Sequence, residues 1–272
     1  MRTRMVTLQA LNLLGFGVMV AVNYAANALP LNDLSTKELS SLYPSLFTPA
    51  GFTFSIWGLI YLSLLGFCIY QASGPLSGPR GRDMLFLHDI GYWFFVSCLL
   101  NAGWIFAWHY THVLLSLAIM VALLLVLIRI YLNLGVGGGT TSFAQNLWVH
   151  VPFRLYLGWI TIATIANVSA LLVHVGWNRW GLSEVFWTVA MIAAATLLTV
   201  GFLILRRDLV VSLVSLWALF GIAAERMAAA EPAAMTVAFS SIVAMGVIGI
   251  LAVWIASRQR RQGVQPLGSA SG

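Results

Sequence analysis

Eight long apolar runs dominate the sequence, and each has about the length that a helix needs to cross a bilayer. A spanning helix takes about 20 apolar residues to cross roughly 30 Å of hydrocarbon. Backbone groups in hydrocarbon must bond to one another, so single apolar runs of this length predict α-helices. The runs lie near residues 5–28, 50–71, 88–109, 112–134, 152–175, 183–205, 208–227 and 233–257. We therefore predict an all-α fold, a polytopic membrane helix bundle with eight transmembrane helices.

Composition excludes a soluble domain and a nucleic-acid-binding protein. The chain is 60% hydrophobic and only 8% charged, too little charge to cover a water-exposed surface. Its basic residues occur singly or in pairs between apolar runs, without the basic stripe that follows a phosphate backbone. The predicted surroundings are therefore the lipid bilayer. Cys68 and Cys98 each lie inside an apolar run, which predicts buried thiols rather than a disulfide.

The distribution of basic residues predicts how the helices are oriented. With eight spans, 11 of the 14 basic residues fall on or beside one side of the membrane, and only Lys37, Arg179 and Arg226 fall on the other. Cytoplasmic loops carry the excess of Lys and Arg, so both termini are predicted in the cytoplasm of a bacterial inner or plasma membrane. A cleaved signal peptide ending near Ala28 is the alternative for the first run. The Gly/Ser-rich tail, residues 258–272, is predicted to be disordered.

Charged residues are scarce in the middle of the predicted spans. Ion-coupled transporters and proton relays need buried carboxylates, so the sequence argues against those classes. The single lysine, Lys37, lies in a loop, which argues against a retinal protein. The sequence predicts no catalytic residue and no metal site.

Aromatic side chains and amides take the place of charges inside the spans. The chain contains 11 Trp, of which Trp57, Trp104, Trp159 and Trp217 lie deep in their runs. An indole N–H in hydrocarbon needs a partner, so a deep Trp usually faces protein or a pocket. Asn residues at helical spacing from these Trp have two interpretations, hydrogen bonds that link helices or the polar groups of an aromatic cavity for a planar, largely apolar ligand.

Three motifs give the chain a family resemblance over residues 5–178. The segment of residues 47–61, FTPAGFTFSIWGLIY, precedes Asn101-Ala102-Gly103-Trp104, and then Tyr156-Leu157-Gly158-Trp159 with Asn167 downstream. In order and spacing they resemble the TspO/MBR family of tryptophan-rich sensory and translocator proteins. The resemblance implies a five-helix core, residues 1–178, whose pocket binds a tetrapyrrole such as porphyrin or haem under a lid at residues 29–49. The three helices of residues 179–257 form a predicted extension.

The resemblance and the helical spacing together give a set of candidate ligand-binding residues. The resemblance implies Trp57, Tyr61, Asn101, Trp104, Trp159 and Asn167, and helical spacing adds Trp108 and Tyr156. The leading hypothesis is a sensory or binding protein for a tetrapyrrole. Two alternatives are a facilitative transporter of a lipophilic metabolite and a membrane enzyme acting on a porphyrin or isoprenoid, the latter disfavoured by the lack of paired carboxylates or a His cluster within the spans. In the extension, small residues such as Ala190, Ala194 and Gly221 predict close helix contacts or a homodimer.

Overall fold

The computed structural model describes residues 2–29, 34, 38–39, 42–73, 84–136, 141–229 and 231–263, and all of their regular secondary structure is helical. Eight long helices correspond to the eight predicted spans: α1 (Arg2–Ala28), α3 (Ile56–Ala72), α5 (Trp93–His109), α6 (Val113–Asn133), α8 (Val151–His174), α9 (Glu184–Arg206), α10 (Leu209–Ala229) and α11 (Pro232–Gly263). Within the described chain, seven helical stretches are long and apolar enough to cross a membrane, and α5 is shorter, with 17 residues. The predicted all-α membrane bundle is confirmed.

Several helix boundaries differ from the predicted ones for local reasons. The span predicted over 88–109 is broken into α4 (Phe86–Ile90) and α5, because Gly91 adopts φ 53°, which ends a helix. The span predicted from residue 152 starts earlier, through α7 (Phe143–Gln145) and the π-helix η4 (Asn146–His150), and Pro152 lies in the first turn of α8. At the chain end, α11 continues through residues 258–263 of the predicted tail, and residues 264–272 lie outside the described part.

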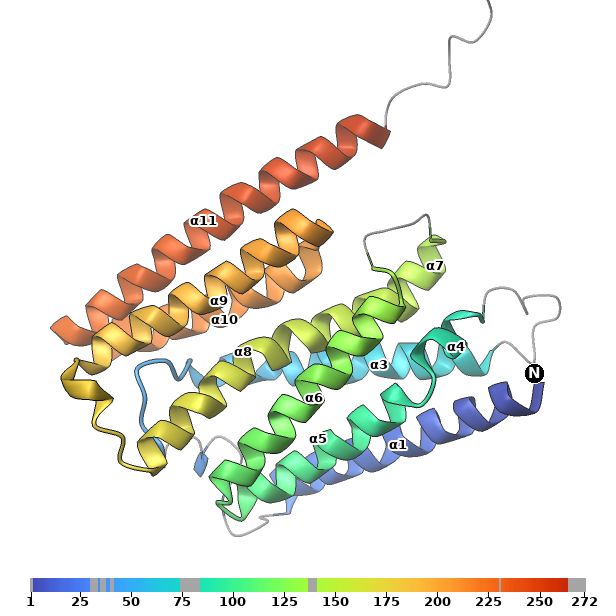
Figure 1. Ribbon diagram of the computed structural model, residues 1–272, viewed down its shortest axis with the longest axis horizontal. Helices are drawn as coiled ribbons and strands as arrows, with labels where there is room; N and C mark the ends of the chain where they lie inside the picture. The colour runs from blue at the N-terminus through green and yellow to red at the C-terminus, as the bar shows by residue number, and fades with distance from the viewer. Residues whose placement is uncertain are drawn as a thin grey trace, which may run out of the picture.

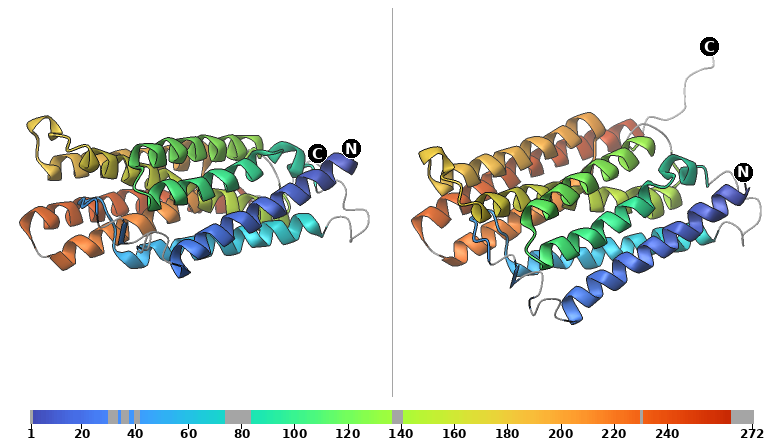
Figure 2. Two further views of the ribbon diagram at one scale, coloured as in Figure 1. Left: turned by 90° about the horizontal axis from the view of Figure 1, so that it is seen from below. Right: turned by 60° about the horizontal axis from the view of Figure 1, so that its bottom comes forward.

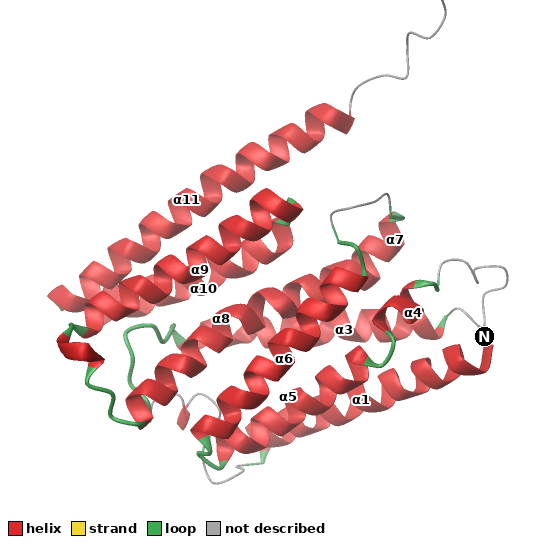
Figure 3. Ribbon diagram, in the orientation of Figure 1, coloured by secondary structure: helices red, strands yellow, loops and turns green. Residues whose placement is uncertain are grey.

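The long helices run along a common direction and form one bundle (Figure 1). α1, α5 and α6 lie on one side, α9, α10 and α11 on the other, and α8 packs between α6 and α10. The start of α1 and the end of α11 lie at the same end of the bundle, as an even number of spans requires (Figure 2). Loops gather at the two ends of the bundle (Figure 3). Many large apolar side chains face outward, where lipid would cover them, including Leu125, Leu197, Leu205 and Ile250.

Buried polar side chains link the first helices to one another. The Asn23 Nδ2 of α1 donates a 2.7 Å hydrogen bond to Asn101 Oδ1 of α5. The Asn101 Nδ2 in turn donates to the Tyr156 hydroxyl of α8 at 2.9 Å. Asn101 and Tyr156 are fully buried, and the bonds satisfy groups that would otherwise be desolvated without a partner. These two hydrogen bonds link α1, α5 and α8 to one another.

A buried ion pair links the C-terminal helices to the rest of the bundle. Arg154 of α8 contacts both carboxylate oxygens of Asp208 at 2.9–3.0 Å. Tyr131 of α6 donates to the same carboxylate at 2.8 Å, and the Val210 and Val211 amides at the start of α10 complete its shell. Asp208 is completely buried, so this shell compensates for the loss of its hydration.

The short 3₁₀ helix η2 (Gly51–Ser55) packs directly on α10. The Ala50 amide donates to the Gly221 carbonyl at 3.0 Å, and the Trp217 indole donates to the Thr53 carbonyl at 2.9 Å. Gly221 has no side chain at this contact, and a Cβ atom there would overlap the Thr53 side chain. The small residue at position 221 therefore supports a close contact within the chain, and the deep Trp217 binds the loop that precedes α3.

Candidate functional site: an aromatic cavity under the residue 42–50 segment

A cavity of about 80 Å³ lies between α3, α5, α6, α8 and α10, near the end of the bundle where η2 lies. The segment of residues 42–50, called the roof segment below, covers it through Tyr43, Ser45, Phe47, Thr48 and Pro49. Its remaining walls are mostly aromatic and aliphatic, formed by Phe54, Trp57, Trp104, Trp108, Met120, Trp159, Ile162, Ala163, Ala166, Asn167, Ala170, Ala218 and Ile222.

Ring contacts hold the tryptophans of the cavity in defined orientations. Trp57 and Trp159 meet edge to face, with ring centroids 6.2 Å apart and an interplanar angle of 82°. Trp104 and Trp108 stack with ring centroids 6.0 Å apart and an interplanar angle of 15°. Residues four apart lie on the same helix face and can make such a contact. Such contacts make the walls rigid and flat, which suits a planar apolar guest.

The structure brings five of the eight predicted site residues to this cavity and places three elsewhere. Trp57, Trp104, Trp108, Trp159 and Asn167 line it. Asn101 and Tyr156 instead belong to the buried chain that links α1, α5 and α8. Tyr61 stacks on the Trp57 ring, with the ring centroids 5.4 Å apart, and does not line the cavity. Asn101 therefore has the helix-linking role, whereas Asn167 lies in the wall of the aromatic cavity.

Two indole N–H groups in the cavity wall have no hydrogen-bond partner among the described residues. They belong to Trp104 and Trp159, which are only 8% and 3% exposed. A buried donor left unpaired costs about 1–3 kcal/mol. The Asn167 side chain in the same wall has its Oδ1 engaged, because that oxygen accepts a 3.2 Å hydrogen bond from Ser116. The wall thus offers two free donors in otherwise apolar surroundings.

Polar contacts at three points hold the roof segment over the cavity. The Ser45 and Ser169 hydroxyls lie 2.7 Å apart, and the Leu46 amide donates to Glu184 Oε1 at 3.1 Å. The third contact is the Ala50–Gly221 backbone bond. Tyr43 packs between Trp108 and His174, and burial raises the pKa of its phenol, which therefore stays neutral. Of the expected lid at residues 29–49, the described residues that line the cavity are Tyr43, Ser45, Phe47, Thr48 and Pro49. Residues 30–33, 35–37 and 40–41 lie outside the described residues.

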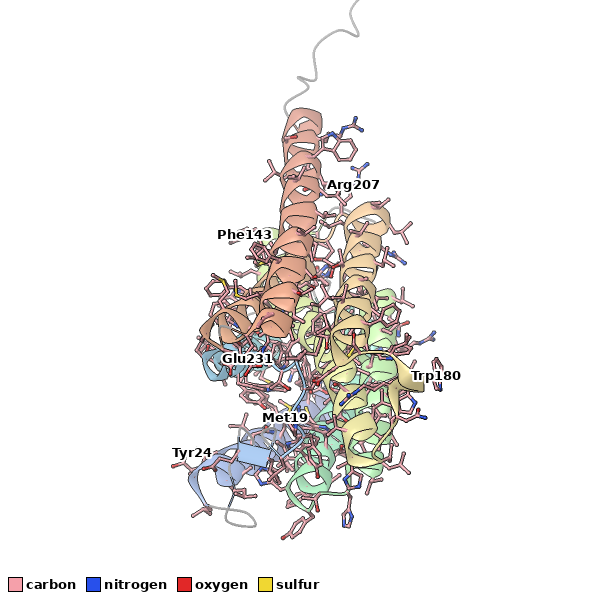
Figure 4. The ribbon with its side chains drawn as sticks, turned by 90° about the vertical axis from the view of Figure 1, so that its left-hand side faces the viewer. Met19, Tyr24, Phe143, Trp180, Arg207 and Glu231 are labelled. Carbon is pink, nitrogen blue, oxygen red and sulfur yellow. The ribbon has the colours of Figure 1, made fainter. Side chains whose placement is uncertain are left out.

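A second, larger and more polar cavity adjoins the first. It has a volume of about 750 Å³, and we call it the vestibule. Ser45 and Thr48 line both cavities, so the roof segment separates them. The vestibule is lined by aromatic and charged residues of the α8–α9 connection, α9 and α10. They include Trp177, Arg179, Glu184, Trp187, Glu225 and Arg226. Figure 4 views this end of the bundle, with Trp180 projecting outward beside it.

The sequence did not predict the contribution of α10 to the cavity. Ala218 and Ile222 of α10 close one side of the cavity, although nothing in the alanine- and leucine-rich α10 sequence distinguishes them from ordinary packing residues. Trp217 was the available signal, because a deep indole must find a partner and its partner is the loop before α3. In the roof segment, the sequence shows that Tyr43 and Phe47 are aromatic but does not show that they line the cavity.

The fold and the cavity define an integral membrane helix bundle with an aromatic pocket formed by its second, third, fourth, fifth and seventh spans. The chain belongs to the TSPO-like protein family, whose model matches residues 9–254. The match extends past residue 178, where the motif resemblance ended, through α9 and α10 and into α11. No curated protein and no solved structure matches the chain.

Proposed function

We propose that this TSPO-like membrane protein binds a planar, largely apolar ligand of the tetrapyrrole class in the aromatic cavity. The single observation that carries the proposal is the convergence of Trp57, Trp104, Trp108 and Trp159 on one cavity with two unpaired indole donors. Flat aromatic walls favour a flat ligand, and the free N–H groups of Trp104 and Trp159 favour one with acceptor atoms.

Ligand entry requires the roof segment to move. Pockets that bury drug-sized ligands measure roughly 300–1,000 Å³, whereas the cavity measures about 80 Å³. Ser45 and Thr48 of the roof segment line both the cavity and the vestibule, and few polar contacts hold that segment. Displacing residues 45–48 would join the two spaces into one of sufficient size.

Facilitative transport is the second candidate, and the vestibule favours it as a possible entrance on one side of the bundle. Toward the other end, however, the bundle is filled. Phe67, Phe94 and Phe153 pack edge to face with centroids 5.1–5.5 Å apart, and all three are fully buried. A path through the membrane would have to disrupt this packed group, so we favour binding over passage.

Porphyrin titration of purified protein tests the proposal. Protoporphyrin IX is added to the detergent-solubilised protein, and binding is followed by the porphyrin Soret band, since the variants remove tryptophan fluorescence. Trp57→Ala and Trp104→Ala should each weaken binding about tenfold or more, because each removes one wall of the cavity. Trp180→Ala is the matched control, since Trp180 is 74% exposed and lies outside the cavity. Equal affinity in all four proteins would refute the proposal.

A further inference from the structure

The vestibule contains an arginine whose surroundings are unusual for its burial. The Arg226 side chain is 15% exposed, and its Nε has no hydrogen-bond partner among the described residues. Its nearest carboxylate oxygen, Glu225 Oε1, lies 3.7 Å from Nη2, too far for a hydrogen bond, and Glu225 itself is 46% exposed. A guanidinium carries five N–H donors, and the buried Nε–H of Arg226 is one that has no acceptor among the described residues.

The same chain shows how a buried arginine is satisfied when its role is structural. Arg154 is 14% exposed, almost the same as Arg226, and it contacts both oxygens of the buried Asp208 at 2.9–3.0 Å. Burying a charge without close pairing is unfavourable. Two arginines of similar burial therefore differ in their partners, because Arg154 has a buried carboxylate at hydrogen-bond distance and Arg226 has only an exposed one at 3.7 Å.

The position of Arg226 indicates where such an anion would come from. Arg226 lines the vestibule together with Arg179, whose own ion pair with Glu184 is also long, at 3.8 Å. The Glu184 carboxylate is partly engaged by the Leu46 amide of the roof segment. Ser45 and Thr48 line both the vestibule and the aromatic cavity, so the space that contains Arg226 adjoins the cavity at the roof segment. A ligand with its body in that cavity would place an edge or side chain in the vestibule.

We propose that Arg226 is an anion-binding residue for the ligand of the aromatic cavity, and that this ligand is therefore amphipathic, with a flat apolar body and a carboxylate or similar anionic group. This inference rests on the proposed function, because it assigns the ligand body to the neighbouring cavity. Arg226 donates to both oxygens of the anionic group in the fork geometry that guanidinium and carboxylate share. Arg179, which is 48% exposed, lies closer to solvent and adds long-range attraction.

A comparison of one porphyrin in its acidic and esterified forms tests this inference. Protoporphyrin IX carries two carboxylates, and its dimethyl ester has the same ring without the charges. Titrations of the wild-type protein and of Arg226→Gln with each form give four dissociation constants. We expect Arg226→Gln to weaken binding of the diacid about tenfold, the range of one charged hydrogen bond. The ester should bind both proteins within about twofold.

Two further variants separate a ligand contact from a general effect of charge. Arg226→Lys keeps the charge and loses the fork, so it should recover only part of the diacid affinity. Arg4→Gln removes one positive charge from an exposed position in the first turn of α1, at the other end of the bundle, and should leave all affinities unchanged.

The possible results distinguish this inference from the proposed function. If the wild-type protein binds neither form, the proposed function itself is wrong. If both forms bind and Arg226→Gln affects them equally, or affects neither, the cavity binds porphyrin but Arg226 does not contact an anionic group. Selective loss of the diacid, with ester binding retained as evidence of an intact fold, supports the inference.

Discussion

Asn101 shows how one residue type can have a structural role where the family resemblance implied a ligand contact. Its amide oxygen accepts from Asn23 and its amide nitrogen donates to Tyr156, so both polar atoms are engaged within the bundle. Asn167, one of the cavity-lining residues, has its oxygen engaged by Ser116 and its side chain at the cavity wall. At the residue scale, the number of unsatisfied donors distinguishes a group available to a ligand from one that packs the core.

Replacing Asn101 should therefore affect stability more than ligand affinity. Asn101→Leu removes two hydrogen bonds and leaves the Tyr156 hydroxyl without its amide donor, which should lower stability by about 1–2 kcal/mol. Thermal unfolding of the purified protein measures this change. Porphyrin affinity, measured at a temperature at which the variant is folded, should stay within about twofold of wild type. A tenfold loss of affinity with unchanged stability would contradict the structural role.

At the element scale, α10 connects the C-terminal helices to the cavity. It contributes Ala218 and Ile222 to the cavity wall, contacts η2 through Gly221, and begins at the Asp208 carboxylate that pairs with α8. The roof segment ends where the Ala50 amide bonds to Gly221. Positions in α10 therefore determine where the roof segment lies, and the C-terminal helices take part in forming the candidate site.

A single methyl group at the η2–α10 contact tests this connection. The Gly221→Ala side chain would overlap Thr53, and relieving the overlap by backbone movement should cost about 1–3 kcal/mol. Thermal unfolding should show the loss, and porphyrin affinity should fall because the roof segment is displaced. Gly201→Ala is the matched control, since a Cβ there meets no atom within 4 Å, and it should be neutral or slightly stabilising.

A second substitution in the same protein checks the cause. Thr53→Ala removes Oγ1 and Cγ2, the two atoms closest to the new methyl group, and leaves only the Thr53 Cβ at 3.0 Å, so the Gly221→Ala, Thr53→Ala double variant should recover part of the lost stability. If Gly221→Ala is as stable as Gly201→Ala, the close packing of η2 on α10 is not present in the protein.

At the scale of the whole molecule, the eight helices place the start of α1 and the end of α11 on one side of the bundle and the cavity toward the other (Figure 2). We propose that the termini are cytoplasmic, because 11 of 14 basic residues belong to that side. The roof segment and the vestibule would then face the opposite compartment. The ligand would enter from outside the cytoplasm, or from the outer leaflet of the membrane.

Cysteine labelling in intact cells tests this orientation. The native Cys68 and Cys98 are buried and free, so they should contribute little background. Trp180→Cys and Ser257→Cys place exposed thiols at opposite ends of the bundle. A membrane-impermeant maleimide should label position 180 in intact cells and position 257 only after permeabilisation. Labelling in the reverse order would show that the termini lie outside.

The sequence alone determined the membrane class, the eight helices and the helix faces that carry the deep tryptophans, because a bilayer requires apolar runs of a set length and helical periodicity places residues on faces. Only the tertiary structure decided what each face meets. Asn101 bonds to Asn23 of α1 and to Tyr156 of α8. Trp57 and Trp159 contact each other in the wall of a cavity. α10, which carries no motif, closes one side of that cavity. Periodicity within one helix predicts the face on which a side chain lies but not which element packs against that face. That neighbouring element decides whether the side chain is part of a packed core or lines a cavity.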